Sequence, residues 1–423
     1  GLPDVKHDVP LKEGAPAAKK AKQRTIITKD IKAPDAVPAS GIAEATKLME
    51  AGKLYRYNVK SAQESIVSLC EMEVAAYTGH KYCVALNSCG SALYLMLLAA
   101  GVEPGDSVLT NAFTFVAVPS AIHHAGGKPV YVESTTGYTM DLADLKKKIE
   151  ASGAKFLMIS HMRGKIADMD EVKRICDASG VTLLEDCAHS IGVRFGDGTA
   201  ASPHTGHHGV ASAISSQSYK MLNSGEGGFY LTDDGVMAAK VAVYAGAYEE
   251  LSVKHLAVPP KEVFGDLPYT LPNYSLRMSQ LSAAVVRPQI GTIEERCEKY
   301  NKRYYMIEER LSKHPNIEVP RQNEKVRICG DSMQFNLKGV TNEQVFKFLE
   351  ETRACGLPCE LFGHPKNARN FVNWKFNLPD VPLPQTEQML CRAVDVRLPL
   401  TWEDSDFVLL CQVIEESLEL VLQ

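Results

Sequence analysis

Apolar positions recur with two different periods along this chain, and the change of period separates strands from helices. Between about residues 80 and 235, short apolar runs rich in β-branched residues alternate with amphipathic stretches. Strands are expected at 107–110, 129–133, 156–160, 181–185 and 228–232, with helices such as 141–150 and 169–178 in this region. This alternation predicts βαβ units and a mainly parallel sheet that is covered on both faces. Ligands are then expected beyond the carboxyl ends of the strands.

The second half of the chain has a different pattern. A long charged helical stretch leads into a block with a strand and two helices, which are expected at 290–314, 332–337, 343–353 and 405–420. We therefore predict two folded domains, a large α/β domain at residues 36–290 and a smaller α+β domain at residues 291–423.

Residues 1–35 contain Lys, Ala and Pro with little apolar periodicity. This composition is typical of a solvated, flexible N-terminal arm. An arm that clasps a second subunit is the alternative interpretation.

Composition narrows the class of protein. The 423 residues are 45% hydrophobic and 23% charged, with a formal net charge of -5. The chain therefore lacks the excess of basic residues that is typical of nucleic-acid-binding proteins. The longest apolar stretch, residues 92–102, is too short to cross a bilayer. Eleven irregularly spaced cysteines do not form a disulfide framework, which favours a reducing compartment. We expect an intracellular, cytoplasmic protein, or an organellar one if a leader was removed before Gly1.

Three segments have residue types that would bind a phosphorylated pyridine aldehyde. Ser88, Cys89 and Gly90 precede an apolar helix, whose free N–H groups can hold a phosphate, although such turns are also common helix caps. Asp186 ends an apolar strand, where it would pair with a protonated ring nitrogen, cap a helix or bind a metal. Lys220 lies between hydroxyl residues and a glycine-rich segment, which is unusual for a lysine on a solvated face.

Six ordered motifs make the chain resemble the DegT/DnrJ/EryC1/StrS family of pyridoxal-phosphate aminotransferases from about residue 45 onward. They are Ser88-Cys89-Gly90-Ser91-Ala92-Leu93, Phe113-Thr114-Phe115-Val116-Ala117, Ala167-Asp168-Met169-Asp170, Glu185-Asp186-Cys187-Ala188-His189, Lys220 with Ser224-Gly225-Glu226-Gly227-Gly228, and Asn273-Tyr274-Ser275-Leu276-Arg277-Met278-Ser279. The resemblance implies a fold-type-I transferase that binds pyridoxal 5'-phosphate.

The same resemblance assigns roles to individual residues. Lys220 would form the Schiff base with the cofactor and then shuttle a proton. Asp186 would keep the ring nitrogen protonated. His189 would lie near the ring hydroxyl, and Phe115 would stack on the ring, with a place in the core as the alternative for Phe115.

Phosphate contacts and the subunit arrangement are also implied by the resemblance. Ser88, Cys89, Gly90 and Ser215 would hold the phosphate, and Asn273 would reach it from the other subunit. The resemblance therefore implies a homodimer with shared active sites.

Two motifs depart from the family, and one of them is the phosphate turn, which has Cys89-Gly90 in place of the usual Gly-Thr. Many sugar aminotransferases have His-Leu-Tyr-Gly where this chain has His161-Met162-Arg163-Gly164. We expect His161 and Arg163 near the substrate, where Arg163 could bind a carboxylate through two hydrogen bonds. The alternative is a structural arginine that pairs with Asp168 or Asp170.

We expect no metal site. The histidines of segment 204–208 lack a clear acidic or thiol partner, and the glycine among them is typical of a mobile loop. Cys355 and Cys359 are expected to be packing residues in a turn.

These observations favour an aminotransferase that uses an amino acid donor, glutamate or glutamine, and a ketone acceptor such as a keto-sugar or keto-cyclitol. One alternative is a pyridoxal-phosphate enzyme that acts on a small carboxylate-bearing substrate by keto acid transamination, elimination or decarboxylation. A regulator that keeps the fold without catalysis is another, although an intact Asp186 and Lys220 weigh against it.

Overall fold

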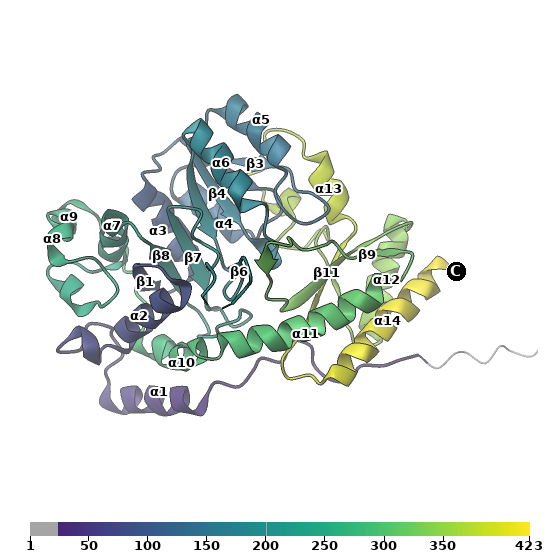
Figure 1. Cartoon of the computed structure of the whole chain (residues 1–423), viewed down its shortest axis with the longest axis horizontal. Helices are drawn as coiled ribbons and strands as arrows, with labels where there is room; N and C mark the ends of the chain where they lie inside the picture. The colour runs from purple at the N-terminus through teal and green to yellow at the C-terminus, as the bar shows by residue number, and fades with distance from the viewer. Residues whose placement is uncertain (1–23, 200) are drawn as a thin grey trace, which may run out of the picture.

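The computed structural model describes residues 24–199 and 201–423. A seven-stranded sheet forms the centre of the larger part of the chain, in the order β1-β8-β7-β5-β4-β2-β3 (Figure 1). Its strands are β1 (Tyr82–Leu86), β2 (Ser107–Asn111), β3 (Lys128–Val132), β4 (Phe156–Ser160), β5 (Thr182–Asp186), β7 (Ala211–Ser215) and β8 (Gly228–Thr232). The strands from β3 to β7 pair in parallel, while β8 runs antiparallel to both of its neighbours. The predicted α/β fold with a mainly parallel sheet is confirmed.

Both faces of this sheet are covered because alternate side chains of each strand enter different cores. In β5, for example, Leu183 packs into the core on one face and Leu184 into the core on the other. One face is covered by α2 (Ile66–Thr78), α5 (Leu142–Ser152) and α6 (Met169–Ser179), and the other by α3 (Cys89–Ala100), α4 (Ala117–His124) and α7 (Gly235–Ala245).

A smaller unit follows the long helix α11 (Ile293–Leu311) (Figure 1). Its antiparallel sheet has the order β12-β13-β11-β9, with β9 (Ile317–Glu318), β11 (Ser332–Leu337), β12 (Glu360–Leu361) and β13 (Ala393–Arg397). Its helices are α12 (Asn342–Ala354), α13 (Pro384–Leu390) and α14 (Asp404–Leu422). The boundary between two domains at residues 290 and 291 stays a prediction.

The remaining elements lie outside the two main sheets and the helices named above. They are the helices α1 (Ala39–Ala51), α8 (Lys261–Phe264), α9 (Leu267–Thr270) and α10 (Gln280–Ile290), the short 3-10 helices η1 (Ala62–Glu64), η2 (Met162–Gly164), η3 (Leu251–Lys254) and η4 (Phe371–Asn373), and the paired strands β6 (Arg194–Phe195) and β10 (Val326–Arg327). Within the described ranges, no helix combines the length and apolar character needed to cross a membrane.

The N-terminal segment differs from the predicted solvated arm where the structure describes it. Ile27 and Ile31 are buried, and the Ile27 N–H donates to the Cys355 carbonyl over 2.8 Å. Thr25 donates to the Glu416 carboxylate through both its N–H and its hydroxyl group. Residues 24–35 therefore pack along the smaller unit, whereas residues 1–23 of the predicted arm lie outside the described residues.

Candidate active site

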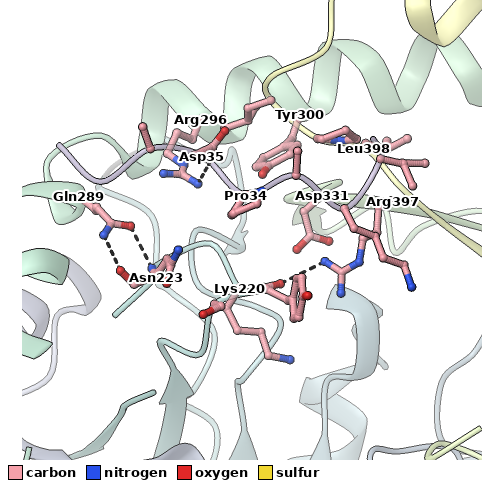
Figure 2. Close-up of a pocket in the computed structure, with 18 of the residues that line it drawn as sticks. Pro34, Asp35, Lys220, Asn223, Gln289, Arg296, Tyr300, Asp331, Arg397 and Leu398 are labelled. Atoms are coloured by element: carbon pink, nitrogen blue, oxygen red, sulfur yellow. Dashed lines mark hydrogen bonds and ion pairs between the residues drawn. The ribbon is translucent and has the colours of Figure 1, made fainter. Parts of the chain in front are cut away.

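Lys220 lies in a closed loop between β7 and β8, two adjacent antiparallel strands. Hydrogen bonds across this loop hold its two sides together, since the Ser216 N–H donates to the Gly227 carbonyl and the Ser218 N–H to the Gly225 carbonyl, both over 3.0 Å. Gln289 of α10 braces the loop from outside by donating to and accepting from the Asn223 backbone (Figure 2). The loop therefore places Lys220 at the carboxyl end of β7, where the sequence predicts a ligand site.

The Lys220 amine contacts His189, which follows β5. Lys220 Nζ lies 2.6 Å from His189 Nε2. Burial and the positive charge of Arg163 lower the pKa of Lys220 to about 7. Burial and the Lys220 charge hold the pKa of His189 well below its usual value. Near neutral pH, this lysine can both accept and release a proton, as general acid-base catalysis requires.

Asp186 ends β5 with its carboxylate fixed by two donors. The Ser160 hydroxyl donates to Oδ2 over 2.7 Å, and the Ala188 N–H donates to Oδ1 over 3.0 Å. The side chain is buried, yet no cation lies at ion-pair distance from it in the part of the chain that the structure describes. A buried carboxylate of this kind provides an oriented acceptor for a protonated nitrogen.

Ser88, Cys89 and Gly90 form the N-terminal turn of α3, on the same cavity. Ser88 caps the helix by accepting from the Ser91 N–H over 3.0 Å. The first N–H groups of a helix have no acceptor inside it, so this turn offers donors and a partial positive charge to an anion. Gly228 at the start of β8 lets the strand approach closely, because a Cβ there would lie 2.5 Å from the Cys89 nitrogen.

A cavity of about 410 Å³ joins these groups. Phe115 lines it with 39% of its surface exposed, so its alternative interpretation as a core residue is wrong. The predicted residues that the structure brings together on this cavity are Ser88, Cys89, Gly90, Phe115, Asp186, His189, Ser215 and Lys220. Eight residues from segments that are far apart along the sequence thus face one space.

Three predicted residues lie elsewhere. His161 is buried and does not line the cavity, and its Nε2 lies 2.8 Å from Glu185 Oε2. Although burial raises the pKa of Glu185, the hydrogen bond from His161 helps to lower it to about 2. Asn273 accepts from the Ser275 N–H over 2.7 Å and does not line the cavity of its own chain.

Arg163 is buried in an ion pair with Asp395 of β13. The prediction that a structural Arg163 pairs with Asp168 or Asp170 is wrong. Asp168 caps α6, and Asp170 pairs with Lys325. The Arg163 backbone has a φ of 55°, a left-handed conformation that directs the side chain toward the smaller unit. Arg163 contributes its charge near Lys220 but does not line the cavity.

The histidine-rich segment 204–208 is packed rather than mobile. His204 is buried and accepts from the Gly192 N–H over 3.0 Å, and His207 stacks on His80 with ring centres 3.8 Å apart. Cys355 and Cys359 are buried near α12 and β12, as packing residues would be.

Sequence patterns missed two arginines, Arg369 and Arg397, that also line the cavity. Both come from the smaller unit, far along the chain from Lys220, and neither belongs to a motif that the sequence singles out. Only the packing of the two sheets together reveals their position. Figure 2 shows Arg397 beside the Lys220 loop, below the segment that contains Pro34 and Asp35.

The residues present fit pyridoxal 5'-phosphate, the cofactor that the resemblance implies. A phosphate needs donors, which the Ser88–Gly90 turn supplies with Ser215 nearby. The ring nitrogen needs a carboxylate, for which Asp186 lies on the cavity without a cationic partner among the described residues. The aldehyde needs an amine, and Lys220 Nζ reaches the same space.

Comparison with known proteins agrees with this geometry. The family model of the DegT/DnrJ/EryC1/StrS aminotransferase family matches residues 45–407. The spore coat polysaccharide biosynthesis protein SpsC of Bacillus subtilis is 33% identical over 203 residues, so the match spans about half of either protein, 48% of this chain and 49% of SpsC. The 3-amino-5-hydroxybenzoate synthase of Amycolatopsis mediterranei is 28% identical over 74% of this chain and 77% of its own.

A solved structure extends the likeness to nearly the whole fold. The PLP form of the sugar aminotransferase Spr1654 from Streptococcus pneumoniae superposes with a TM-score of 0.78 at 17% identity. This superposition covers 92% of the present chain and 98% of the other. The shared fold places the Lys220 cavity in a fold-type-I architecture.

Proposed function

Because this chain belongs to the DegT/DnrJ/EryC1/StrS aminotransferase family, we propose that it is an aminotransferase that depends on pyridoxal 5'-phosphate. The amino group moves from an amino acid donor, glutamate or glutamine, to a ketone acceptor such as a keto-sugar or keto-cyclitol. The names of the relatives, a polysaccharide biosynthesis protein and an aminohydroxybenzoate synthase, support an acceptor of this class. The observation that carries the proposal is the convergence of Lys220, Asp186 and the Ser88–Gly90 turn on one cavity.

Each residue of the site has a separate task. When bound, pyridoxal phosphate supplies an electron sink that stabilises negative charge at the substrate α-carbon. Asp186 would accept a hydrogen bond from the ring nitrogen and keep it protonated, and Phe115 would orient the ring by packing against it. Lys220 would hold the cofactor through its amine and would then act as the group that accepts and releases a proton. His189 holds the lysine amine in place through the 2.6 Å contact.

The catalytic unit that we propose is a homodimer. Asn273 lies outside the cavity of its own chain, and its side-chain oxygen accepts from the Ser275 N–H. In a two-fold dimer, the partner subunit's Asn273 would reach the phosphate bound at Ser88–Gly90. Each site would then need residues from both subunits.

Half-reaction spectroscopy tests the proposed function. The purified enzyme, loaded with pyridoxal phosphate, is mixed with single amino acids while cofactor absorbance and released keto acid are followed. We expect glutamate or glutamine to remove the absorbance of the lysine-bound cofactor and to release one keto acid per site. A ketone acceptor should then restore this absorbance. Release of carbon dioxide, or of keto acid with free ammonia, would instead establish decarboxylation or elimination. An enzyme that no donor discharges would contradict amino transfer and favour a regulator.

A further inference from the structure

A buried asparagine lies at the carboxyl end of β2, outside the Lys220 cavity. Asn111 is the last residue of this strand, and its amide oxygen accepts from the Ser160 N–H over 2.8 Å. Its amide nitrogen donates to the Ser160 carbonyl over 3.0 Å and to the Phe113 carbonyl over 2.8 Å. Because the oxygen has a donor and both N–H groups have acceptors, the orientation of this side chain is fixed.

The Asn111 side chain stands in for backbone pairing between β2 and β4. In the described strands, their parallel ladder pairs Val108 with Phe156 and Leu109 with Leu157 and ends there. The ladder between β4 and β5 continues to Ser160. The backbone N–H and carbonyl of a buried residue need partners, and Asn111 supplies both for Ser160. Asn111 therefore holds the end of β4 as a neighbouring strand would.

Ser160 connects this asparagine to Asp186. The two residues lie opposite each other in the register of β4 and β5, and the Ser160 hydroxyl donates to Asp186 Oδ2 over 2.7 Å. A hydrogen bond to an ionised carboxylate stabilises its ionised form. A carboxylate that stays ionised leaves the proton of a hydrogen-bonded pyridine on the ring nitrogen. The hydroxyl group of Ser160 thus favours the protonated ring that the proposed chemistry needs.

The third hydrogen bond of Asn111 fixes the segment that leads to Phe115. Phe113 accepts from Asn111 at its carbonyl, and its N–H donates to the Ser134 hydroxyl over 3.2 Å. Phe115 follows two residues later and lines the cavity. One buried amide is therefore connected both to the carboxylate proposed for the ring nitrogen and to the residue proposed to pack against the ring.

On the basis of the proposed cofactor chemistry, we propose that Asn111 and Ser160, the Asn111–Ser160 relay, are positioning residues that control protonation of the cofactor ring nitrogen through Asp186. Ser160 donates to the carboxylate, and Asn111 fixes Ser160 at the place from which it donates. Neither residue lines the cavity, so both act through other side chains. The relay makes the strength of the electron sink depend on residues that substrate does not touch.

The NMR resonance of the cofactor ring nitrogen tests the relay without turnover, because its position differs between a protonated and a neutral nitrogen. Isotopically labelled pyridoxal phosphate is bound to each variant. Ser160→Ala should move the resonance toward the neutral position, and Asn111→Ala should move it in the same direction. Ser160→Thr, which keeps the hydroxyl group, should hold it near the wild-type position. In an Asp186→Asn background, Ser160→Ala should cause no further shift, because the carboxylate through which it acts is gone.

Deuterium exchange at the donor α-carbon measures the chemical consequence. We expect Ser160→Ala to slow this exchange by about 10- to 100-fold, the effect of losing a hydrogen bond to a charged group. Asn111→Ala should slow it further, because this change also releases the Phe113 carbonyl. Ser160→Thr should recover most of the rate. The loss caused by Ser160→Ala should disappear in the Asp186→Asn background.

Two variants away from the relay are the controls. The Ser212 hydroxyl is buried in β7 of the same sheet and has no hydrogen-bond partner in the described part of the chain, so Ser212→Ala should change neither measurement. Asn336 is a buried asparagine of β11 that accepts from the Tyr138 hydroxyl and donates to the Thr136 carbonyl. Asn336→Ala should lower stability in urea but leave the resonance and the exchange rate of the folded enzyme unchanged.

Three results would overturn the proposal. They are an unshifted resonance in Ser160→Ala, a shift in Ser160→Thr as large as that in Ser160→Ala, and an equal loss of exchange by Ser160→Ala with and without Asp186→Asn. Because the serine variants alone decide these outcomes, the test does not depend on whether Asn111→Ala folds. Failure of amino transfer would appear differently, as absence of exchange in the wild-type enzyme with every donor, whereas the resonance reports only the bound cofactor.

Discussion

The chemistry of the site depends on a lysine amine whose surroundings favour its neutral form. Lys220 is half-buried, and the charges of Arg163 and Arg369 both lower its pKa. Asp186 acts in the opposite direction, since its negative charge raises the same pKa. The balance leaves an amine that is a nucleophile and a proton carrier near neutrality.

Cofactor loading should reveal this altered lysine. Because the pKa falls from 10.5 to about 7, the neutral nucleophile is present above pH 7 and is lost as the pH falls below it. We expect the rate at which apoenzyme acquires the absorbance of lysine-bound pyridoxal phosphate to rise between about pH 6 and 8 and then level. A rate that continues to rise beyond pH 9 would show an ordinary lysine. Stopped-flow absorbance across buffers of equal ionic strength makes the comparison.

Substitution of Asp186 tests the control of the ring nitrogen. Asp186→Asn should keep pyridoxal phosphate bound through its phosphate but slow α-proton abstraction by several orders of magnitude, because a neutral amide does not stabilise the ring-nitrogen proton. Ser160→Ala is a milder control, because it removes one hydrogen bond to the Asp186 carboxylate. It should raise the activation free energy of α-proton abstraction by no more than about 1.5 to 3 kcal/mol. Deuterium exchange at the donor α-carbon measures the step, and near-normal exchange in Asp186→Asn would assign the task to another acid.

Individual site residues were predictable where a local motif surrounds them, as for Lys220 and Asp186. Arg163 shows the limit, because its partner Asp395 lies in a different sheet and its left-handed backbone turns the side chain toward it. The sequence therefore indicated that Arg163 lies near the site. It did not show that the Arg163 side chain points toward Asp395 and away from the cavity.

At the scale of elements, the phosphate turn depends on how closely β8 approaches α3. A Cβ at Gly228 would lie 2.5 Å from the Cys89 nitrogen and 2.6 Å from its Cα, and both neighbours are backbone atoms that cannot rotate away. The antiparallel direction of β8 brings this glycine, at the start of the strand, to the edge where the parallel strands end.

Gly228→Ala should therefore displace the turn and weaken cofactor binding. We expect a loss of about 1 to 3 kcal/mol in the free energy of unfolding, the cost of overpacking, and a higher dissociation constant for pyridoxal phosphate. Gly291→Ala is the matched control, because no atom lies within 4 Å of a Cβ built there. Urea unfolding and equilibrium dialysis measure the two effects. Equal behaviour of the two variants would contradict the proposed tight approach.

The ion pair of Arg163 and Asp395 joins η2 to β13, and so joins the two parts of the chain. Asp395 also accepts from Gln334 Nε2 over 2.8 Å. Asp395→Asn should lower the free energy of unfolding by about 3 to 5 kcal/mol, because it leaves a buried guanidinium group uncompensated. Glu309→Gln, which breaks the exposed pair with Lys313, should change it by less than about 1 kcal/mol. A loss of substrate selectivity in Arg163→Lys at unchanged stability would instead restore Arg163 as a substrate ligand.

Elements with strong periodicity were predictable almost to their ends. The helix expected at 169–178 spans Met169–Ser179, and the strand expected at 332–337 is β11. The direction of β8 was not predictable, because nothing in an apolar run of five residues states which way it crosses the sheet. The packing of residues 24–35 was missed for a similar reason, since two isoleucines spaced four apart give little periodic signal.

At the scale of the whole molecule, the proposed dimer makes a quantitative prediction. Asn273→Ala should weaken cofactor retention, and mixing this variant with Lys220→Ala should restore activity. Random exchange makes half of the dimers mixed, and each mixed dimer has one intact site, so about a quarter of the sites should be active. Lys220→Ala mixed with Asp186→Asn is the control, because both residues belong to the cavity of one chain and a mixed dimer of these variants therefore has no intact site. Absence of restored activity in subunits shown to exchange would mean that each chain builds its site alone.

The central claim is that Lys220 tethers the cofactor and is released by an amino donor. Borohydride reduction followed by peptide mass spectrometry tests both parts in one measurement, because reduction makes the tether permanent. We predict pyridoxyl label on the peptide containing Lys220 in the resting enzyme, and loss of that label when excess glutamate or glutamine is added before reduction. Label on another lysine, or label on Lys220 that no amino donor removes, would contradict the account.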